Sequence, residues 1–144
     1  MKRVSIIVPV KDEEEGLKYL QSDFHDSNLD SDFETTFIIV IDERTNDRSR
    51  QIAQNFTHQI IDQKKTHGKG AAIQQAKDYW RKDKTDFVVF LDADGSYSFQ
   101  GVRDILNAIE DGADVASGSR FLNGGRPKGM SMLHYFGNKS LSLI

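Results

Sequence analysis

Short apolar runs alternate with longer amphipathic stretches along most of the chain. Five runs, rich in β-branched residues, fall at Val4–Val10, Thr36–Ile41, Gln59–Ile61, Phe87–Leu91 and Asp114–Ala116. Continuous apolar runs of this length are typical of parallel strands that are buried on both faces. The pattern therefore predicts five short strands, separated by segments of a different kind.

The segments between these strands have the spacing of helices. Apolar residues recur in them at intervals of three and four, which places those side chains on one face of a helix. The four sets are Leu17, Leu20 and Phe24; Ile52, Ala53 and Phe56; Ala72, Ile73, Ala76 and Trp80; and Val102, Ile105, Leu106 and Ile109. Asp47 and Ser49 are candidate caps for the second helix, and Gly112 is placed to end the fourth. Strands and helices in strict alternation predict an α/β fold with a mostly parallel, Rossmann-like sheet and flanking helices.

The pattern changes after Gly118. The glycine-rich segment Asn123–Gly129 predicts a loop, and the apolar positions from Met130 to Ile144 predict the start of a further helix. A chain of 144 residues has the length of one domain, which we expect to span residues 1–144.

Composition and charge exclude several classes of function. The formal net charge of -3 gives no overall attraction for nucleic acid, so no nucleic-acid partner is expected. The chain has no cysteine, which excludes disulfides and thiolate metal sites and fits a reducing, cytoplasmic location. No apolar run approaches the ~20 residues of a membrane span. The apolar start of the chain stops at Lys11, too early for a signal peptide.

Candidate binding residues follow the apolar runs, because ligands of an open parallel sheet bind beyond the carboxyl ends of its strands. After the first run stands the acidic segment Lys11–Glu15. It has no glycine fingerprint or Walker A pattern and would repel a pyrophosphate, but its carboxylates could accept hydrogen bonds from a base or a ribose. Alternatively, Asp12 caps the first helix and the glutamates favour the positive end of that helix. Both interpretations hold together if Glu13 binds a ligand.

The second and third runs are followed by polar loops of opposite character. Asp42 stands where a ribose- or base-binding carboxylate belongs, and the alternative is a polar turn with a helix cap at Asp47. In Gly68–Gly70, the glycines allow the backbone to approach a ligand, and Lys69 adds positive charge at the start of a helix. That combination suits a diphosphate, although an ordinary loop has the same composition. We assign no role to His67.

Asp92 and Asp94, at the end of the fourth run, are the most specific indication of a binding site in the sequence. In an extended segment their side chains point to opposite faces, so a turn is needed to bring both to one ion, and Gly95 permits it. Hard carboxylate oxygens suit Mg²⁺ or Mn²⁺, which is commonly held by one or two carboxylates together with substrate phosphates. The alternative is a solvated turn. After the fifth run, Arg120 is placed either to clamp phosphate oxygens in a bidentate fork or to form a surface ion pair.

Taken in order, these loops resemble the family 2 glycosyltransferases, which have a GT-A fold, and in particular the polyprenyl- and dolichyl-phosphate mannose or glucose transferases. The matching motifs span nearly the whole chain: Pro9–Glu13, Ile39–Asp42 with Asp47, Gly68–Gly70, Asp92–Gly95, Gly118–Phe121 and Gly137–Lys139. The resemblance implies a single GT-A nucleotide-sugar-binding domain, in which residues 118–144 form a loop and the start of an acceptor-side helix.

The resemblance also implies roles for single residues. The nucleotide sugar would be held by Pro9, Val10, Glu13, Asp42, Lys69, Asp92, Ala93 and Asp94, with the first four on the nucleoside. Asp92 would contact ribose or metal, Asp94 would hold the metal, and Ser96 stands where a third metal ligand occurs. Asp94 and Arg120 would be catalytic, Arg120 through the donor diphosphate or the acceptor phosphate.

The reaction implied is the transfer of a hexose from UDP-glucose or GDP-mannose to polyprenyl phosphate, with inversion at the anomeric carbon and Mg²⁺ or Mn²⁺ as cofactor. A phosphate monoester, whose second pKa is about 6, is already anionic at neutral pH, so this acceptor needs no general base. A lipid acceptor implies peripheral contact with the cytoplasmic face of a membrane. The basic and apolar segment Arg120–Lys139 suits that contact, and the alternative is a loop and a helix that pack on the core.

Departures from the family pattern keep two other functions open. Glu43, Arg44 and Arg48 stand where the family has a second acidic residue and glycines, and the arginines are expected to stiffen that turn. Family members are longer than this chain, so we expect a fold that is truncated at its C-terminus. The alternatives are a non-catalytic nucleotide-sugar-binding module and a nucleotidyltransferase, although the acidic Lys11–Glu15 segment opposes a triphosphate. A second copy of the chain is a further candidate partner, for an exposed apolar C-terminal segment.

Overall fold

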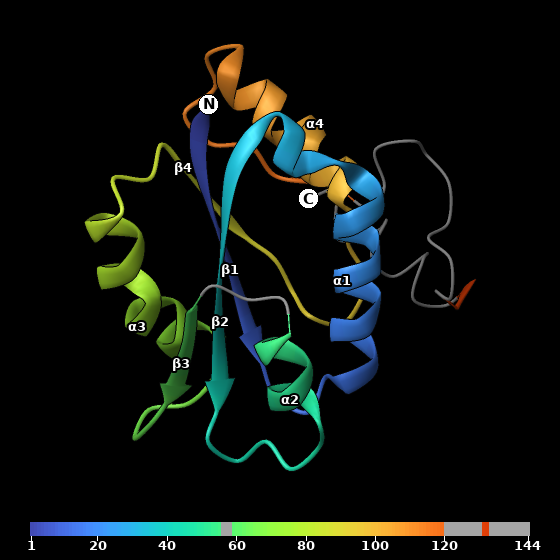
Figure 1. Ribbon diagram of the computed structural model, residues 1–144, viewed down its shortest axis with the longest axis vertical. Helices are drawn as coiled ribbons and strands as arrows, with labels where there is room; N and C mark the ends of the chain where they lie inside the picture. The colour runs from blue at the N-terminus through green and yellow to red at the C-terminus, as the bar shows by residue number, and fades with distance from the viewer. Residues whose placement is uncertain (56–58, 120–130, 133–144) are drawn as a thin grey trace.

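Four of the five predicted strands form one sheet in the computed structural model, which describes residues 1–55, 59–119 and 131–132. The strands are β1 (Lys2–Val10), β2 (Phe33–Asp42), β3 (Gln59–Gln63) and β4 (Phe87–Phe90). All are parallel, and their order across the sheet is β3-β2-β1-β4 (Figure 1). β1 and β2 pair along their whole length, from Lys2 opposite Phe33 to Val10 opposite Ile41. Their carboxyl ends therefore finish side by side at one end of the sheet.

Helices cover both faces of this sheet, as buried parallel strands require. They are α1 (Glu14–Ser27), α2 (Ser49–Gln54), α3 (Lys69–Lys82) and α4 (Phe99–Glu110), with a 3₁₀ turn at Leu29–Ser31. α3 lies on one face, whereas α1, α2 and α4 lie on the other (Figure 1). Each predicted apolar stripe falls on one of these helices and packs toward the sheet, although Phe56 lies outside the described residues. Gly112, with a φ of 108°, follows the end of α4 as predicted.

The sequence of β1 shows why the strands are apolar throughout. Val4, Ile6, Val8 and Val10 face α1, α2 and α4, whereas Ile7 faces α3, and none of the five is more than 3% exposed. Successive side chains of a strand point to opposite faces. A strand that is covered on both sides therefore needs an apolar residue at nearly every position.

An aromatic cluster fastens α1 and α4 to the sheet. The rings of Phe24, Phe37 and Phe99 meet edge to face, with centroids 4.8, 5.1 and 5.9 Å apart. Phe99 begins α4, and its backbone N–H donates to the Asp23 carboxylate of α1 at 2.6 Å. These contacts fix the start of α4, and with it the turn that joins β4 to α4.

The fifth predicted strand is wrong. Residues 113–119 contain no strand, and the side chain of Val115 is 84% exposed. A strand needs a neighbour to pair with its backbone, and within the described part of the chain β4 pairs only with β1. The short run Asp114–Ala116 offers a single large apolar side chain, which is too little to bury a strand edge.

Residues after Ser119 are described only at 131–132, so the loop and helix predicted over 118–144 lie almost wholly outside the described residues. The same holds for Arg120 and for the segment Arg120–Lys139 that is expected to meet a membrane. Among the helices that the structure does describe, none has the length and apolar character to cross a bilayer.

Candidate functional site

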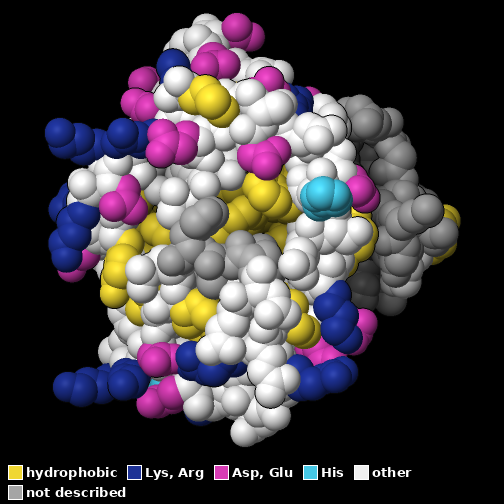
Figure 2. Space-filling view, in the orientation of Figure 1, with side chains coloured by type: hydrophobic (Ala, Val, Ile, Leu, Met, Phe, Trp, Pro, Cys, Tyr) yellow, Lys and Arg dark blue, Asp and Glu magenta, His cyan; other side chains and the backbone are white. Residues whose placement is uncertain are grey.

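A pocket of about 270 Å³ opens where the loops after β1 and β2, the start of α3 and the turn after β4 meet. Its lining residues are Pro9, Val10, Lys11, Glu13, Asp42, Arg44, Gln63, Gly68, Lys69, Asp92, Ala93 and Asp94. Every residue expected to hold the nucleotide sugar is among them. Acidic and basic side chains both lie along this end of the molecule, the lower edge of the view in Figure 2. The structure thus brings the predicted residues together, while their roles stay predictions.

The first loop is held by the second, and Asp12 does not cap α1. Asp12 has a left-handed φ of 53°, and its Oδ1 accepts from the backbone N–H of Asn46 at 2.7 Å. The N-terminus of α1 is instead satisfied from the loop after β2. The backbone N–H of Glu13 donates to the Ser49 hydroxyl at 2.9 Å, and that of Glu14 donates to the Asp47 carboxylate at 3.0 Å.

Asp47 serves both helices at once. Besides its bond to α1, its Oδ1 accepts from the backbone N–H of Ser49, the first residue of α2, at 2.9 Å, although the N-cap position is Arg48 and not the predicted Asp47 or Ser49. Arg48 adds an ion pair, with Nη2 2.5 Å from Glu14 Oε1. Arg48, one of the two arginines that depart from the family pattern, therefore ties the two loops together, in agreement with the expected stiffening of this turn.

Glu14 is expected to make the folded chain sensitive to acid. Hydrogen bonds from Arg48, and then from Lys18, lower the pKa of Glu14 from its ordinary 4.5 to about 2. A carboxyl with a lower pKa in the folded state contributes stability that is complete above the unfolded pKa and is lost as the pH falls toward the folded one. The unfolding free energy should therefore drop between about pH 4.5 and about pH 2, and Glu14→Gln should flatten part of that drop.

Urea unfolding at about pH 6 and about pH 3 measures this difference. Glu15→Gln is the matched control, because the neighbouring Glu15 side chain is 83% exposed and pairs with Lys18. Equal acid sensitivity in Glu14→Gln and in the unaltered chain would contradict the prediction.

Asp42 ends β2 and is buried, only 3% exposed, beside the pocket. Arg44 holds it in a two-pronged fork, with Nε donating to Oδ1 at 2.8 Å and Nη2 to Oδ2 at 2.7 Å. These hydrogen bonds hold the pKa of the Asp42 carboxyl well below its usual range. His67 completes the surroundings, because its Nδ1 lies 3.3 Å from Oδ2. The loop pattern predicts neither of these neighbours.

Lys69 stands at the start of α3, where the sequence places it, and forms an ion pair with Asp92. The preceding Gly68 has a φ of 88°, which favours glycine. Its carbonyl accepts from Nε2 of Gln63 at 2.9 Å. Gln63 is 3% exposed, and a polar residue at the buried end of a strand is the signal by which the sequence could have revealed it.

The turn after β4 has the predicted shape. Gly95 adopts a φ of 74°, and the backbone N–H of Ser96 donates to Asp94 Oδ1 at 2.9 Å. Ser96 itself is exposed and does not line the pocket. Burial raises the pKa of Glu13, and the charges of Asp94, Asp47 and Asp92 raise it further. The pocket therefore has an acidic wall beside the positive Lys69.

Gly16 supports the turn that carries Asp92 and Asp94, and the loop motifs do not point to it. It lies in the first turn of α1, against the backbone of the turn after β4. A Cβ at this position would stand 1.8 Å from the carbonyl oxygen of Ala93. Only a glycine allows the helix to approach the Asp92–Asp94 turn so closely, and the signal was a glycine inside an otherwise helix-favouring stretch.

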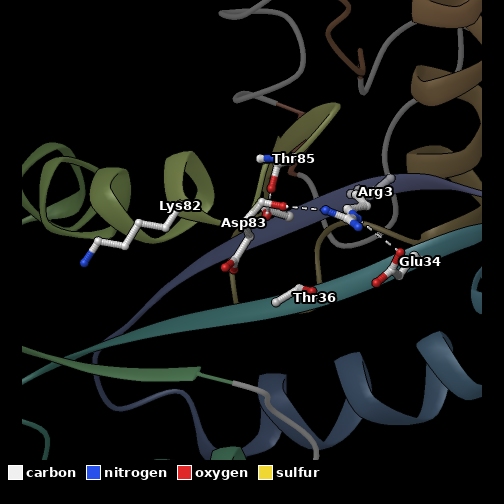
Figure 3. Close-up of a pocket in the computed structure, with 9 residues that line it drawn as sticks. Arg3, Glu34, Thr36, Lys82, Asp83 and Thr85 are labelled. Carbon is white, nitrogen blue, oxygen red and sulfur yellow. Dashed lines mark hydrogen bonds and ion pairs between the residues drawn. The ribbon is translucent and has the colours of Figure 1, made fainter.

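A second hollow, of about 430 Å³, lies at the opposite end of the sheet (Figure 3). Arg3 spans it, with Nε donating to Glu34 Oε2 at 3.3 Å and Nη1 to the Asp83 carbonyl at 3.1 Å. The hydroxyls of Ser5 and Thr85 share a hydrogen bond of 2.6 Å. These polar groups satisfy one another, and ligands of a parallel sheet bind at its other end. The functional site is therefore the pocket at the carboxyl ends.

Curated proteins are similar to this chain over most of its length. Dolichol-phosphate mannosyltransferase of Pyrococcus furiosus is 27% identical over 128 residues, which cover 86% of this chain and 35% of that protein. Polyprenol monophosphomannose synthase of Mycolicibacterium smegmatis is 27% identical over 132 residues, which cover 86% of this chain and 47% of that protein. The chain thus spans less than half the length of these relatives.

A solved structure and a family model agree with the fold. The crystal structure of S. aureus TarS matches with a TM-score of 0.57 and 21% identity, over 77% of this chain and 20% of that one. At this identity the likeness shows the fold alone, which is the predicted GT-A arrangement. The model of glycosyl transferase family 2 matches residues 5–141. Because that match takes in nearly the whole chain, the protein belongs to glycosyl transferase family 2.

Proposed function

We propose that this chain forms the donor-binding part of an inverting glycosyltransferase, which moves a hexose from a nucleotide diphosphate sugar to polyprenyl phosphate. One observation carries the proposal: a single pocket gathers a buried carboxylate, a lysine at a helix start and the Asp92–Asp94 turn. The names of the two relatives, a dolichol-phosphate mannosyltransferase and a polyprenol monophosphomannose synthase, support this acceptor and favour mannose as the sugar.

The start of α3 suits the donor diphosphate. Backbone N–H groups at a helix N-terminus and the helix dipole both favour an anion. No atom would come within 4 Å of a Cβ at Gly68 or Gly70, so the backbone there is open to a ligand. Lys69, which pairs with Asp92, adds a positive charge there.

Asp92 and Asp94 are the residues that would hold Mg²⁺ or Mn²⁺. Their oxygens suit these ions, but among the described residues no three His, Cys, Asp or Glu side chains are grouped to hold a metal alone. Phosphates of the donor would therefore complete the coordination. A bound ion supplies positive charge that stabilises the leaving nucleoside diphosphate. Ser96 stays a predicted third ligand.

The proposal for the acceptor rests on the chemistry of a phosphate monoester, and on no residue that the structure describes. A polyprenyl phosphate is anionic at neutral pH and can attack the anomeric carbon without a general base. Arg120, outside the described residues, stays the predicted partner of a phosphate. A water-soluble donor and a lipid acceptor meet at a membrane surface, so the proposal places the reaction at the cytoplasmic face of a membrane.

Calorimetric titration tests the donor site directly. UDP, GDP, UDP-glucose and GDP-mannose are each titrated with and without Mn²⁺, into the unaltered chain and into Asp94→Asn. Binding of one nucleotide should strengthen with Mn²⁺, and Asp94→Asn should weaken that binding by about tenfold or more, because it removes a charged metal ligand.

Asp78→Asn is the matched control, since Asp78 is exposed on α3, away from the pocket. It should bind like the unaltered chain. Absence of nucleotide binding under every metal condition would remove the proposal. Donor binding without any transfer of sugar to polyprenyl phosphate would instead favour the non-catalytic binding module.

A further inference from the structure

The carboxylate of Asp42 is already surrounded by donors of its own chain. Arg44 gives it three hydrogen bonds: Nε and the backbone N–H to Oδ1, at 2.8 and 2.9 Å, and Nη2 to Oδ2 at 2.7 Å. His67 Nδ1 lies 3.3 Å from Oδ2. An ionised carboxylate offers about four lone-pair directions. Four protein nitrogens already lie within 3.3 Å of the two oxygens, which leaves little room for the N–H groups of a nucleobase.

Burial makes this arrangement hard to exchange. Asp42 is 3% exposed, and a buried charge that loses its partner is left uncompensated. A neutral N–H of a base would have to replace a guanidinium, whose hydrogen bonds to a carboxylate are charge-assisted and therefore stronger. Asp42 is thus built to hold Arg44 rather than to meet a ligand itself.

Arg44 keeps free donors beside the pocket. Its side chain is 52% exposed, and the residue lines the pocket. A guanidinium has five N–H donors, and the fork uses Nε–H and one N–H of Nη2. Three donors remain, and two of them lie parallel across the Nη1–Nη2 end of the group. Among the described residues, no side chain or carbonyl accepts a hydrogen bond from them.

We propose that Arg44, and not Asp42, is the residue of this chain that reads the nucleobase of the donor, and that Asp42 is a positioning residue that acts through Arg44. The inference rests on the proposed function, because it takes a nucleotide as the occupant of the pocket. Asp42 fixes the plane of the guanidinium, which turns a flexible side chain into an oriented pair of donors.

Two parallel donors select a base with two neighbouring acceptors. Guanine has them in O6 and N7, and arginine binds this pair bidentately in nucleic-acid complexes. Uracil places an N–H between its carbonyls, and adenine places an amino group beside N7. Arg44 therefore favours a guanine nucleotide over uracil and adenine nucleotides.

Two analogues of GDP separate the two residues without any substitution in the protein. 7-deaza-GDP lacks the N7 acceptor, and IDP lacks the 2-amino donor that a carboxylate would bind. If Arg44 reads the base, the unaltered full chain with Mn²⁺ should bind IDP like GDP, and 7-deaza-GDP about tenfold more weakly. If Asp42 reads the base, IDP should be the weak ligand and 7-deaza-GDP should equal GDP, which would overturn the inference.

Variants provide a second test of the positioning role. Arg44→Lys keeps the positive charge but cannot form the fork, so the difference between GDP and 7-deaza-GDP should disappear. Asp42→Asn should reduce the same difference, because the guanidinium loses its charged anchor. Arg81→Lys, on the exposed side of α3, is the control and should keep the full difference. A full difference in Arg44→Lys would overturn the inference.

The nucleotide panel also separates this inference from the proposed function. Binding of UDP in preference to GDP would overturn the assignment of Arg44 and leave the donor site standing. Equal affinities for GDP and 7-deaza-GDP would likewise overturn the assignment of Arg44 and leave the donor site standing. Failure of every nucleotide to bind, with or without Mn²⁺, would remove the donor site and the inference together.

Discussion

Alanine in place of Gly16 is expected to weaken nucleotide binding by about tenfold or more, although it adds only one methyl group. Its Cβ would stand 1.8 Å from the Ala93 carbonyl oxygen and 2.8 Å from the Ala93 carbonyl carbon. Both partners are backbone, so no side chain can turn away to relieve the contact. Either α1 or the Asp92–Asp94 turn must move, and a displaced turn should cost at least as much affinity as the loss of one metal ligand, about tenfold or more.

Gly101→Ala is the matched control, because Gly101 is the third residue of α4 as Gly16 is the third of α1. A Cβ at Gly101 would meet only the Ser98 hydroxyl, at an ordinary 3.6 Å. This variant should bind nucleotide normally and gain up to about 1 kcal/mol in stability from the better helix former. Titration of the nucleotide identified above measures the difference. Normal binding by Gly16→Ala would mean that α1 can withdraw without moving the turn.

Phe99→Ala should lower the free energy of unfolding by about 3–5 kcal/mol, the usual cost of removing a buried phenylalanine ring. The Phe99 side chain is fully buried, and its ring meets those of Phe24 and Phe37 edge to face at 5.1 and 5.9 Å. The variant leaves a hollow between α1, α4 and the sheet. Because α1 and α4 enclose that hollow, neither can fill it without disturbing the other.

Urea unfolding measures this loss, with Phe90→Ala as the control. Phe90 is 50% exposed on β4 and contacts the Trp80 ring at a centroid distance of 6.1 Å. Its removal should cost about 1 kcal/mol or less, the value of an exposed aromatic pair. Equal losses in the two variants would contradict the view that the aromatic cluster anchors α4.

The features that the sequence predicts well are those in which one local pattern has one physical cause. Burial on both faces makes a strand apolar throughout, and four of the five apolar runs are strands. Ligand sites at the carboxyl ends of parallel strands place Asp42, Lys69 and Asp94 correctly in one pocket. The run Asp114–Ala116 is not a strand, because its single large apolar residue is not buried between two packed layers.

The features that the sequence does not predict depend on partners that are distant along the chain. The caps of α1 come from Asp47 and Ser49, more than thirty positions from the residues they serve. Spacing arguments see only neighbours and therefore assign the cap to Asp12. The glycine at Gly16 is required by the Ala93 backbone, and no periodicity can reveal that contact.

Arg44 lies between these two cases. Its departure from the family pattern is visible in the sequence, but the direction of its side chain is not. A residue that stiffens the turn and one that lines the pocket look the same in the sequence, and in the structure Arg44 does both.

The reciprocal bonds between the first two loops constrain how such a chain can change over generations. Asp12 serves the backbone of Asn46, while Asp47 and Ser49 serve the backbone at the start of α1. A substitution in one loop therefore leaves a bare N–H in the other. Substitutions in the two loops are therefore expected to be correlated among related sequences, although the loops are about thirty positions apart in the chain.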